Sequence, residues 1–154
     1  MQVNIFTDGS SRGNPGPGGY GIVMLSGKHR KEFSAGYRNT TNNRMELLAV
    51  IVALQKLKLH GLFVTIHTDS KYVCEAVEKK WVFGWEKKDF KGKKNADLWK
   101  IFLKLYPKNH ISFRWIKGHN GHKENERCDE LATEAADDSK NLLADEGFES
   151  GLYN

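Results

Sequence analysis

The sequence predicts an α/β fold whose strands and helices follow one another in the order βββαβααβα. Three short strand-like stretches come first, and glycine-rich or turn-like segments separate them. Helical patterns with capping residues then alternate with two further short strands. Three leading strands fit a meander, and the later strands fit crossover connections.

The predicted strands are short and bounded by turn residues. They cover residues 3–7, 20–25, 31–37, 63–68 and 110–116. A glycine-rich loop over residues 9–19 separates the first two strands. The residues Ser26-Gly27-Lys28 are typical of a hairpin turn between the second and the third.

The predicted helices are recognised by their ends. They cover residues 43–59, 69–79, 96–106 and 124–136. Asn43 is a good N-cap for the first helix, with Glu46 three residues on and Gly61 just past the end. The centre of that helix is apolar all round, which predicts burial. Asn95 is the predicted cap of the third helix, and Pro107 stops it.

Length and composition limit the class of protein. The chain has 154 residues, of which 39% are hydrophobic and 11% aromatic, which predicts one globular domain. We expect residues 1–136 to form that domain and residues 137–154 to be an acidic, poorly ordered tail. The longest apolar run, residues 47–54, is far shorter than the roughly 20 residues of a membrane-spanning helix. We see no signal-peptide pattern and no cysteine framework, so we expect a cytoplasmic protein.

Charge is unevenly distributed along the chain, although the formal net charge is only +5. Residues 79–94 contain seven lysines and two acidic residues, whereas residues 124–154 contain ten acidic and two basic residues. Everything before residue 124 is therefore strongly basic. Such asymmetry indicates an acidic polymer as partner.

Three acidic residues stand out because each lies at the end of a predicted element. Asp8 ends the first strand, Glu46 lies near the start of the buried helix, and Asp69 follows the fourth strand. Each has a simpler interpretation: a turn residue, part of a capping box, and a helix cap. Together they indicate a site for Mg²⁺ or Mn²⁺, since two such ions can clamp a phosphodiester for hydrolysis.

A second cluster of polar residues spans residues 117–129. A zinc site built from His119, His122 and Cys128 would lack a persuasive fourth ligand and a usual spacing. A glycine-flanked histidine such as His122 is better suited to proton transfer, because its pKa lies near neutrality. Asp129 is either a fourth metal carboxylate or an exposed residue on a polar helix face.

Two further segments suggest contacts with phosphates. Thr41, Asn42 and Asn43 lie beside a helix start, where backbone N–H groups favour phosphate, although capping alone would also explain them. In residues 79–94, lysines alternate with aromatic residues, which is typical of nucleic-acid binding. The alternative is a solvated lysine face over core aromatics. Trp81 and Trp85 share a helix face, so we expect at least one of them to be structural.

The sequence resembles the type 1 (bacterial) ribonucleases H over about residues 3–135. The resemblance rests on five motifs in family order: Thr7-Asp8-Gly9-Ser10, Gly-Asn-Pro-Gly-Pro-Gly-Gly at 13–19, Thr-Thr-Asn-Asn-Arg-Met-Glu at 40–46, Thr68-Asp69-Ser70, and residues 117–131. It implies the ribonuclease H-like fold, a five-stranded mixed sheet with helices on both faces. It also implies Mg²⁺-dependent endonucleolytic cleavage of the RNA strand of RNA–DNA hybrids, leaving 5′-phosphate and 3′-hydroxyl ends.

The resemblance also implies roles for single residues. Asp8, Glu46, Asp69 and Asp129 resemble the metal-binding carboxylates, which hold two ions per site with substrate bound. His122 resembles the residue that assists proton transfer and product release. The residues expected to contact the hybrid, including a basic protrusion at 79–94, are Asn14, Thr41, Asn42, Asn43, Lys71, Trp81, Trp85, Lys87 and Lys88.

Two other functions remain as alternatives. A non-catalytic hybrid-binding module would bind without cleaving, and the intact set of four acids argues against it. The other alternative is a DNA-cutting nuclease of the same fold group; the basic protrusion and the three asparagines Asn14, Asn42 and Asn43 argue against it. We expect a monomer without an obligate protein partner, since no exposed apolar stripe is evident.

Overall fold

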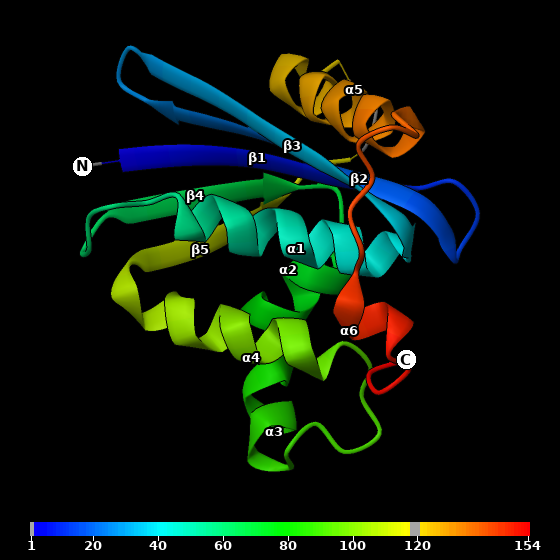
Figure 1. Ribbon diagram of the computed structural model, residues 1–154. Helices are drawn as coiled ribbons and strands as arrows, with labels where there is room; N and C mark the ends of the chain where they lie inside the picture. Colours follow the sequence, from blue (N-terminus) through cyan, green and yellow to red (C-terminus); the bar gives the residue numbers. More distant parts are fainter. Residues whose placement is uncertain (1, 118–120) are drawn as a thin grey trace.

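A computed structural model describes residues 2–117 and 121–154, and one five-stranded sheet organises them (Figure 1). Its strands are β1 (Gln2–Ser11), β2 (Gly16–Ser26), β3 (His29–Thr40), β4 (Phe63–Thr68) and β5 (His110–Trp115). They lie in the order β3-β2-β1-β4-β5. The first three strands pair antiparallel, and β4 and β5 run parallel to β1. The predicted mixed sheet is therefore confirmed.

Helices cover both faces of the sheet, with α5 on the side opposite α1 (Figure 1). The helices are α1 (Asn42–Gln55), α2 (Lys71–Glu78), α3 (Trp81–Lys87), α4 (Ala96–Leu105), α5 (Lys123–Asp137) and α6 (Glu146–Glu149), and a 3₁₀ turn spans Tyr106–Lys108. No helix within residues 2–117 and 121–154 combines the length and the apolar character needed to cross a membrane.

The main core lies between the sheet and α1, as the all-apolar centre of that helix predicts. Val50 of α1 is fully buried against a cluster that includes Ile5 and Ile66 from the sheet and Trp99 and Phe102 from α4. Burying each such side chain contributes about 1.5–3 kcal/mol. Helix α1 is consequently held in one position, and so are the residues at its N-terminus.

The predicted loop over residues 9–19 is wrong in its extent. Strand β1 continues to Ser11 and β2 begins at Gly16, so only residues 12–15 form the connection. Several glycines in this segment serve packing rather than turning. A side chain at Gly19 would collide with the backbone of Ala132 and Ala136 in α5. The glycine therefore allows α5 to lie close to the sheet.

Three predicted helix boundaries also differ from the structure. Thr41 caps α1, since its hydroxyl accepts a hydrogen bond from the Arg44 N–H at 3.2 Å; Asn43 is not the cap, and Glu46 lies beyond any capping box. Helix α1 ends at Gln55 rather than at residue 59. Ser70, not Asp69, caps α2, since its hydroxyl accepts a hydrogen bond from the Val73 N–H at 3.2 Å.

Asn95 occupies the N-cap position of α4, as predicted, but its side chain does not cap the helix. It adopts a left-handed backbone conformation there, with φ of 66°. Its side-chain oxygen instead accepts a hydrogen bond from Arg44 Nη1 at 3.2 Å.

The acidic tail contains α6, whereas the sequence predicts poor order there. Arg44 is almost fully buried and pairs with Asp145 at 2.8 Å and with Asp97 at 2.7 Å. The Thr40 hydroxyl donates a further hydrogen bond to Asp145 at 2.6 Å. The tail is tied to α1, β3 and α4 through these contacts. Within a run of acids, nothing in the sequence distinguishes Asp145 from its solvated neighbours.

Replacing Asp145 tests whether the tail stabilises the domain. Asp145→Ala would leave the buried Arg44 with one carboxylate fewer, so we expect the free energy of unfolding to fall by about 3 kcal/mol. Urea denaturation monitored by circular dichroism measures this change.

The matched control is Glu149→Ala, which removes the more exposed ion pair with Arg38 in the same tail and should cost less than about 1 kcal/mol. Burial alone would raise the pKa of Asp145, but hydrogen bonds from Arg44 and Thr40 outweigh it and lower the pKa. The stabilisation is therefore present above the unfolded pKa of about 3.9 and is lost as the pH falls through the folded value. Equal losses in the two variants would contradict this role.

Candidate active site

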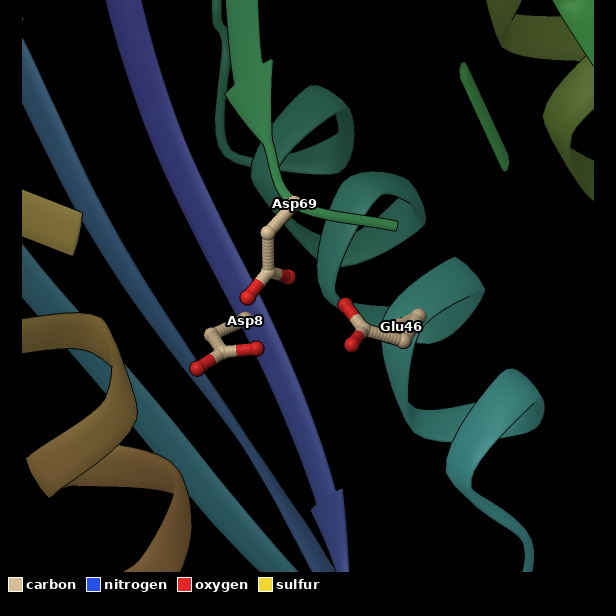
Figure 2. Close-up of side chains that lie close together, drawn as sticks. All are labelled: Asp8, Glu46 and Asp69. Carbon is tan, nitrogen blue, oxygen red and sulfur yellow. The ribbon is translucent and has the colours of Figure 1, made fainter. Parts of the chain in front are cut away.

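Three acidic side chains meet where β1, β4 and α1 come together. Asp8 lies on β1, Glu46 in the first half of α1, and Asp69 directly after β4. One carboxylate oxygen from each lies within 4.8 Å of the others. Figure 2 shows the three carboxylates pointing toward one another.

Strand pairing and one glycine bring these acids together. Strands β1 and β4 are parallel neighbours, so Asp8 and Asp69 lie near the same edge of the sheet. A side chain at Gly9 would collide with the backbone nitrogen of Glu46, so only glycine lets α1 approach β1 this closely. The Gly9 N–H also donates a hydrogen bond to Asp8 Oδ1 at 2.9 Å.

The cluster is buried and electrostatically unfavourable without a cation. Asp8 is 5% exposed and Glu46 is 6% exposed. Burial, followed by the charges of Asp69 and Asp129, raises the pKa of Asp8 to about 8, although the Gly9 N–H opposes the shift. Burial and the charges of Asp8 and Asp69 raise the pKa of Glu46 well above its usual range. A bound cation would relieve this repulsion.

The residues present fit a divalent cation. Glu46 Oε2 is buried and has no hydrogen-bond partner among the described residues. A buried carboxylate oxygen normally has a partner, and a bound metal ion would provide one here. Carboxylate oxygens are the ligands that Mg²⁺ and Mn²⁺ prefer. Asp69, Asp8 and Glu46 could therefore hold such an ion between β1, β4 and α1.

Asp129 lies on α5 beside this cluster. The negative charge of Asp129 contributes to the raised pKa of Asp8, so the two side chains lie near each other. Asp129 is half-buried, in contrast to the exposed Glu126 and Glu130 of the same helix. The structure therefore brings all four predicted carboxylates to one region, with Asp129 at its border.

His122 and Cys128 do not form a zinc site in the described residues. His122 precedes α5 and is exposed, whereas Cys128 is buried and its thiol donates a hydrogen bond to the Phe6 carbonyl at 3.2 Å. His119 lies outside the described residues. His122 instead borders a concavity that also contains His67.

The predicted hybrid contacts around the start of α1 lie close together. Asn14 Oδ1 accepts a hydrogen bond from the Asn42 N–H at 3.0 Å, which joins the glycine-rich connection to α1. Asn42 and Asn43 are exposed, whereas the Thr41 hydroxyl is occupied by the helix cap. These exposed amides and the buried Glu46 are therefore carried by one rigid helix.

The basic stretch forms α3 and the turns that flank it. Trp85 packs edge-on against Trp99, with ring centroids 5.9 Å apart, whereas Trp81 is 48% exposed. Lys87 and Lys88 are exposed. A concavity of about 360 Å³ is lined by Asn43, Tyr72, Trp81, Trp85, Gly92, Lys93, Lys94 and Asn95. The basic stretch therefore faces the start of α1.

Trp115 is a residue of this region that the sequence analysis did not single out. Its indole N–H donates a hydrogen bond to the Asp69 carbonyl oxygen at 3.1 Å. The Lys71 ammonium lies over the Trp115 ring, 4.9 Å from its centroid. In a strand of alternating polar and apolar residues, a tryptophan is expected to be a core residue. The contact with Asp69 becomes evident only from the pairing of β5 with β4.

Asp8 lies within β1 rather than at its end, because the strand continues to Ser11. A mixed sheet in this order, with acids on β1, on α1 and directly after β4, defines a ribonuclease H-like protein. A family model described as RNase H matches residues 1–137. The chain belongs to the ribonuclease H family. This confirms the family and the fold predicted from the motifs.

Relatives match nearly the whole chain. A ribonuclease H from Desulforamulus reducens is 53% identical over 140 residues, covering 88% of this chain and 87% of the relative. One from Klebsiella pneumoniae is 52% identical over 152 residues, covering 96% of each. Among solved structures, LC9-RNase H1, a type 1 RNase H with the type 2 active-site motif, has a TM-score of 0.80 and 29% identity, covering 98% of this chain and 81% of its own. LC11-RNase H1 in complex with RNA/DNA hybrid has a TM-score of 0.70 and 29% identity, covering 90% and 99%.

Neutralising Asp8 tests how much the repulsion within the acidic cluster lowers the free energy of unfolding. We expect Asp8→Asn to raise the free energy of unfolding in EDTA by about 1 kcal/mol at pH 8, because repulsion is relieved. Since the pKa of Asp8 is raised in the folded state, the stability of the metal-free wild type falls as the pH rises from about 4 to about 8. Denaturation in EDTA across this range measures both effects.

Glu126→Gln, on the exposed face of α5, is the matched control and should change little. Mg²⁺ should raise the unfolding temperature of the wild type and of this control, but much less that of Asp8→Asn. A loss of stability in EDTA for Asp8→Asn would contradict the repulsion.

Proposed function

We propose that this chain hydrolyses the RNA strand of RNA–DNA hybrids with divalent cations held by its acidic cluster. One observation carries the proposal: Asp8, Glu46 and Asp69 converge, and the buried Glu46 Oε2 has no hydrogen-bond partner among residues 2–117 and 121–154. Family membership supports the reaction class. The RNA/DNA hybrid bound by LC11-RNase H1 supports the substrate.

Asp8, Glu46, Asp69 and Asp129 would hold Mg²⁺, with Mn²⁺ as the alternative, and two ions with substrate bound. Such ions supply charge stabilisation and an activated water, with 5′-phosphate and 3′-hydroxyl ends as products. The protein's part is to keep four carboxylates together despite their repulsion. Their oxygens would therefore serve as metal ligands rather than as proton donors or acceptors.

We assign proton transfer to His122. Its ring is exposed at the start of α5, outside the buried acids, so it can exchange protons with solvent. An imidazole can accept a proton at a ring nitrogen and release it again, which suits a proton-transfer role. This fits a residue that assists the departure of the leaving group and the release of product.

Hybrid recognition would be divided between two surfaces. Asn14, Asn42 and Asn43 present amides that suit 2′-hydroxyl groups and base edges of the minor groove, which distinguish RNA from DNA. Thr41, Lys71, Trp81, Trp85, Lys87 and Lys88 suit the phosphates and sugars of the hybrid. Contacts of this kind predict little sequence preference. Because α1 carries both Asn43 and Glu46, recognition and cleavage would share one rigid element.

All groups assigned here come from one chain, so we also infer a monomer without an obligate protein partner. Cys74 and Cys128 are both free and buried, which agrees with a reducing, cytoplasmic setting.

Asp69→Asn tests the proposed function directly. Labelled RNA–DNA hybrid, duplex DNA and duplex RNA are offered with Mg²⁺ or EDTA, and the cleavage rate is measured. We expect the wild type to cut only the RNA of the hybrid, and only with Mg²⁺. The variant should lose at least about a hundredfold in rate, because even outer contacts of a metal site cost 10–100-fold.

Glu78→Gln, an exposed acid of α2, serves as control and should keep the wild-type rate. Binding of hybrid without cleavage by the wild type would instead support a binding module. Cutting of duplex DNA would support the alternative nuclease, and wild-type turnover of Asp69→Asn would overturn the site.

The basic stretch is tested by removing its charge. Replacing Lys87, Lys88, Lys91, Lys93 and Lys94 by alanine should raise KM and weaken the salt dependence of binding. Each lost phosphate contact reduces the log–log slope by about 0.7 to 0.9. The control replaces five exposed lysines elsewhere: Lys28, Lys31, Lys58, Lys104 and Lys140. Equal effects of the two sets would show that only net charge matters.

A further inference from the structure

In the part of the chain that the structure describes, no helix covers the β4–β5 side of the sheet face opposite α1. Helix α5 packs across β1, β2 and β3, and Figure 1 shows it over these strands. On the same side of the sheet, every second residue of β4 and β5 points away from α1. We call this surface the open face; it consists of Phe6, Phe63, His67, His110, Arg114 and Lys117. Phe63 is 56% exposed, and His110 and Arg114 are exposed as well.

Two pairs of stacked rings lie on the open face, one toward each end of β4. The rings of Phe6 and His67 are 4.3 Å apart between centroids and inclined by 10°. The rings of Phe63 and His110 are 4.6 Å apart and inclined by 17°. Both pairs join residues that are direct neighbours across paired strands. Such flat, partly exposed π surfaces are suited to stacking with nucleobases.

Arg114 is the one arginine without an ion pair in the described residues. Arg12, Arg30, Arg38, Arg44 and Arg127 each contact a carboxylate. Arg114 pairs across the sheet with His67 and lines a concavity of about 440 Å³ that also contains Lys117. No acidic side chain of the described residues lines this concavity. Its charge is therefore complementary to an anion.

The concavity adjoins the acidic cluster. Phe6 lies two residues before Asp8 on β1, and His67 of β4 lies two residues before Asp69, which directly follows that strand. Trp115, which follows Arg114 and also lines the concavity, donates its hydrogen bond to the Asp69 carbonyl. His122 lies at the border as well. A polynucleotide strand that passes the acids can continue directly onto this surface.

We propose that the open face binds an unpaired extension of the substrate's RNA strand, beyond the hybrid. This inference rests on the proposed function, which puts the RNA strand at the acids. The ring pairs would stack with bases, and Arg114 and Lys117 would contact phosphates. Because the acids act on the RNA strand, RNA is the strand that continues from them onto the adjoining open face.

The test compares hybrids that differ only in a single-stranded extension. Affinity is measured in EDTA for a blunt hybrid, for hybrids with the RNA strand extended at either end, and for hybrids with the DNA strand extended. We expect one RNA extension to tighten binding by roughly fivefold or more, as base stacking predicts. The salt dependence should steepen by about 0.7 in log–log slope per added phosphate contact.

Arg114→Glu should abolish the gain from the extension, and Phe63→Ser should reduce it. Lys28→Glu, which makes the same charge change in the exposed β2–β3 turn, should retain the gain. Thermal unfolding of each variant verifies that it is folded. Cleavage of the blunt hybrid by the wild type in Mg²⁺ is measured in parallel.

Several results would overturn the inference. These are equal affinities for blunt and RNA-extended hybrids, an undiminished gain in Arg114→Glu, or an equal gain from the DNA-strand extension. Self-association that Arg114→Glu removes, without any effect on RNA, would show a second copy of the chain on the open face instead. If the wild type fails to cleave the blunt hybrid, the proposed function itself fails. Cleavage without an extension effect removes only this inference.

Discussion

Mutual repulsion among Asp8, Glu46 and Asp69 is the constraint that the surrounding structure must overcome. Burial raises the pKa values of Asp8 and Glu46, and repulsion from the neighbouring carboxylates raises them further. The parallel pairing of β1 with β4 and the close approach at Gly9 hold the acids together nonetheless. The packing of the main core stabilises the fold enough to hold the acids together. A divalent cation bound among them would replace their mutual repulsion by attraction to the cation.

Support for the site extends to the end of the chain. Arg44 lies two residues before Glu46 and is buried among Asp97, Asp145 and Asn95. Through it, the tail, α4 and the start of α1 form one connected network. The exposed amides of Asn42 and Asn43 are held by the same turn of helix. A change in the tail can therefore alter the position of Asn42 and Asn43, which we propose to contact the hybrid, without contacting them directly.

Local patterns in the sequence predict the parts of this protein that local physics decides. Strand β4 is predicted residue for residue, and Asp8, Glu46 and Asp69 stand out because acids at element ends are rare in the basic half of the chain. Contacts between residues that are distant in the chain could not be predicted from these local patterns. The glycines of residues 9–19 read as a loop, since nothing local shows that α5 and α1 press against them. Asp145, Trp115 and Arg114 likewise acquire their importance only from residues distant in the chain.

The central claim is that the acidic cluster binds divalent cations. Anomalous diffraction from crystals grown with Mn²⁺ tests it most directly. The account predicts anomalous density bounded by the carboxylates of Asp8, Glu46 and Asp69, and its absence in crystals of Asp69→Asn prepared identically. Anomalous density located elsewhere on the protein, with the three carboxylates left without an ion at saturating Mn²⁺, would contradict the claim.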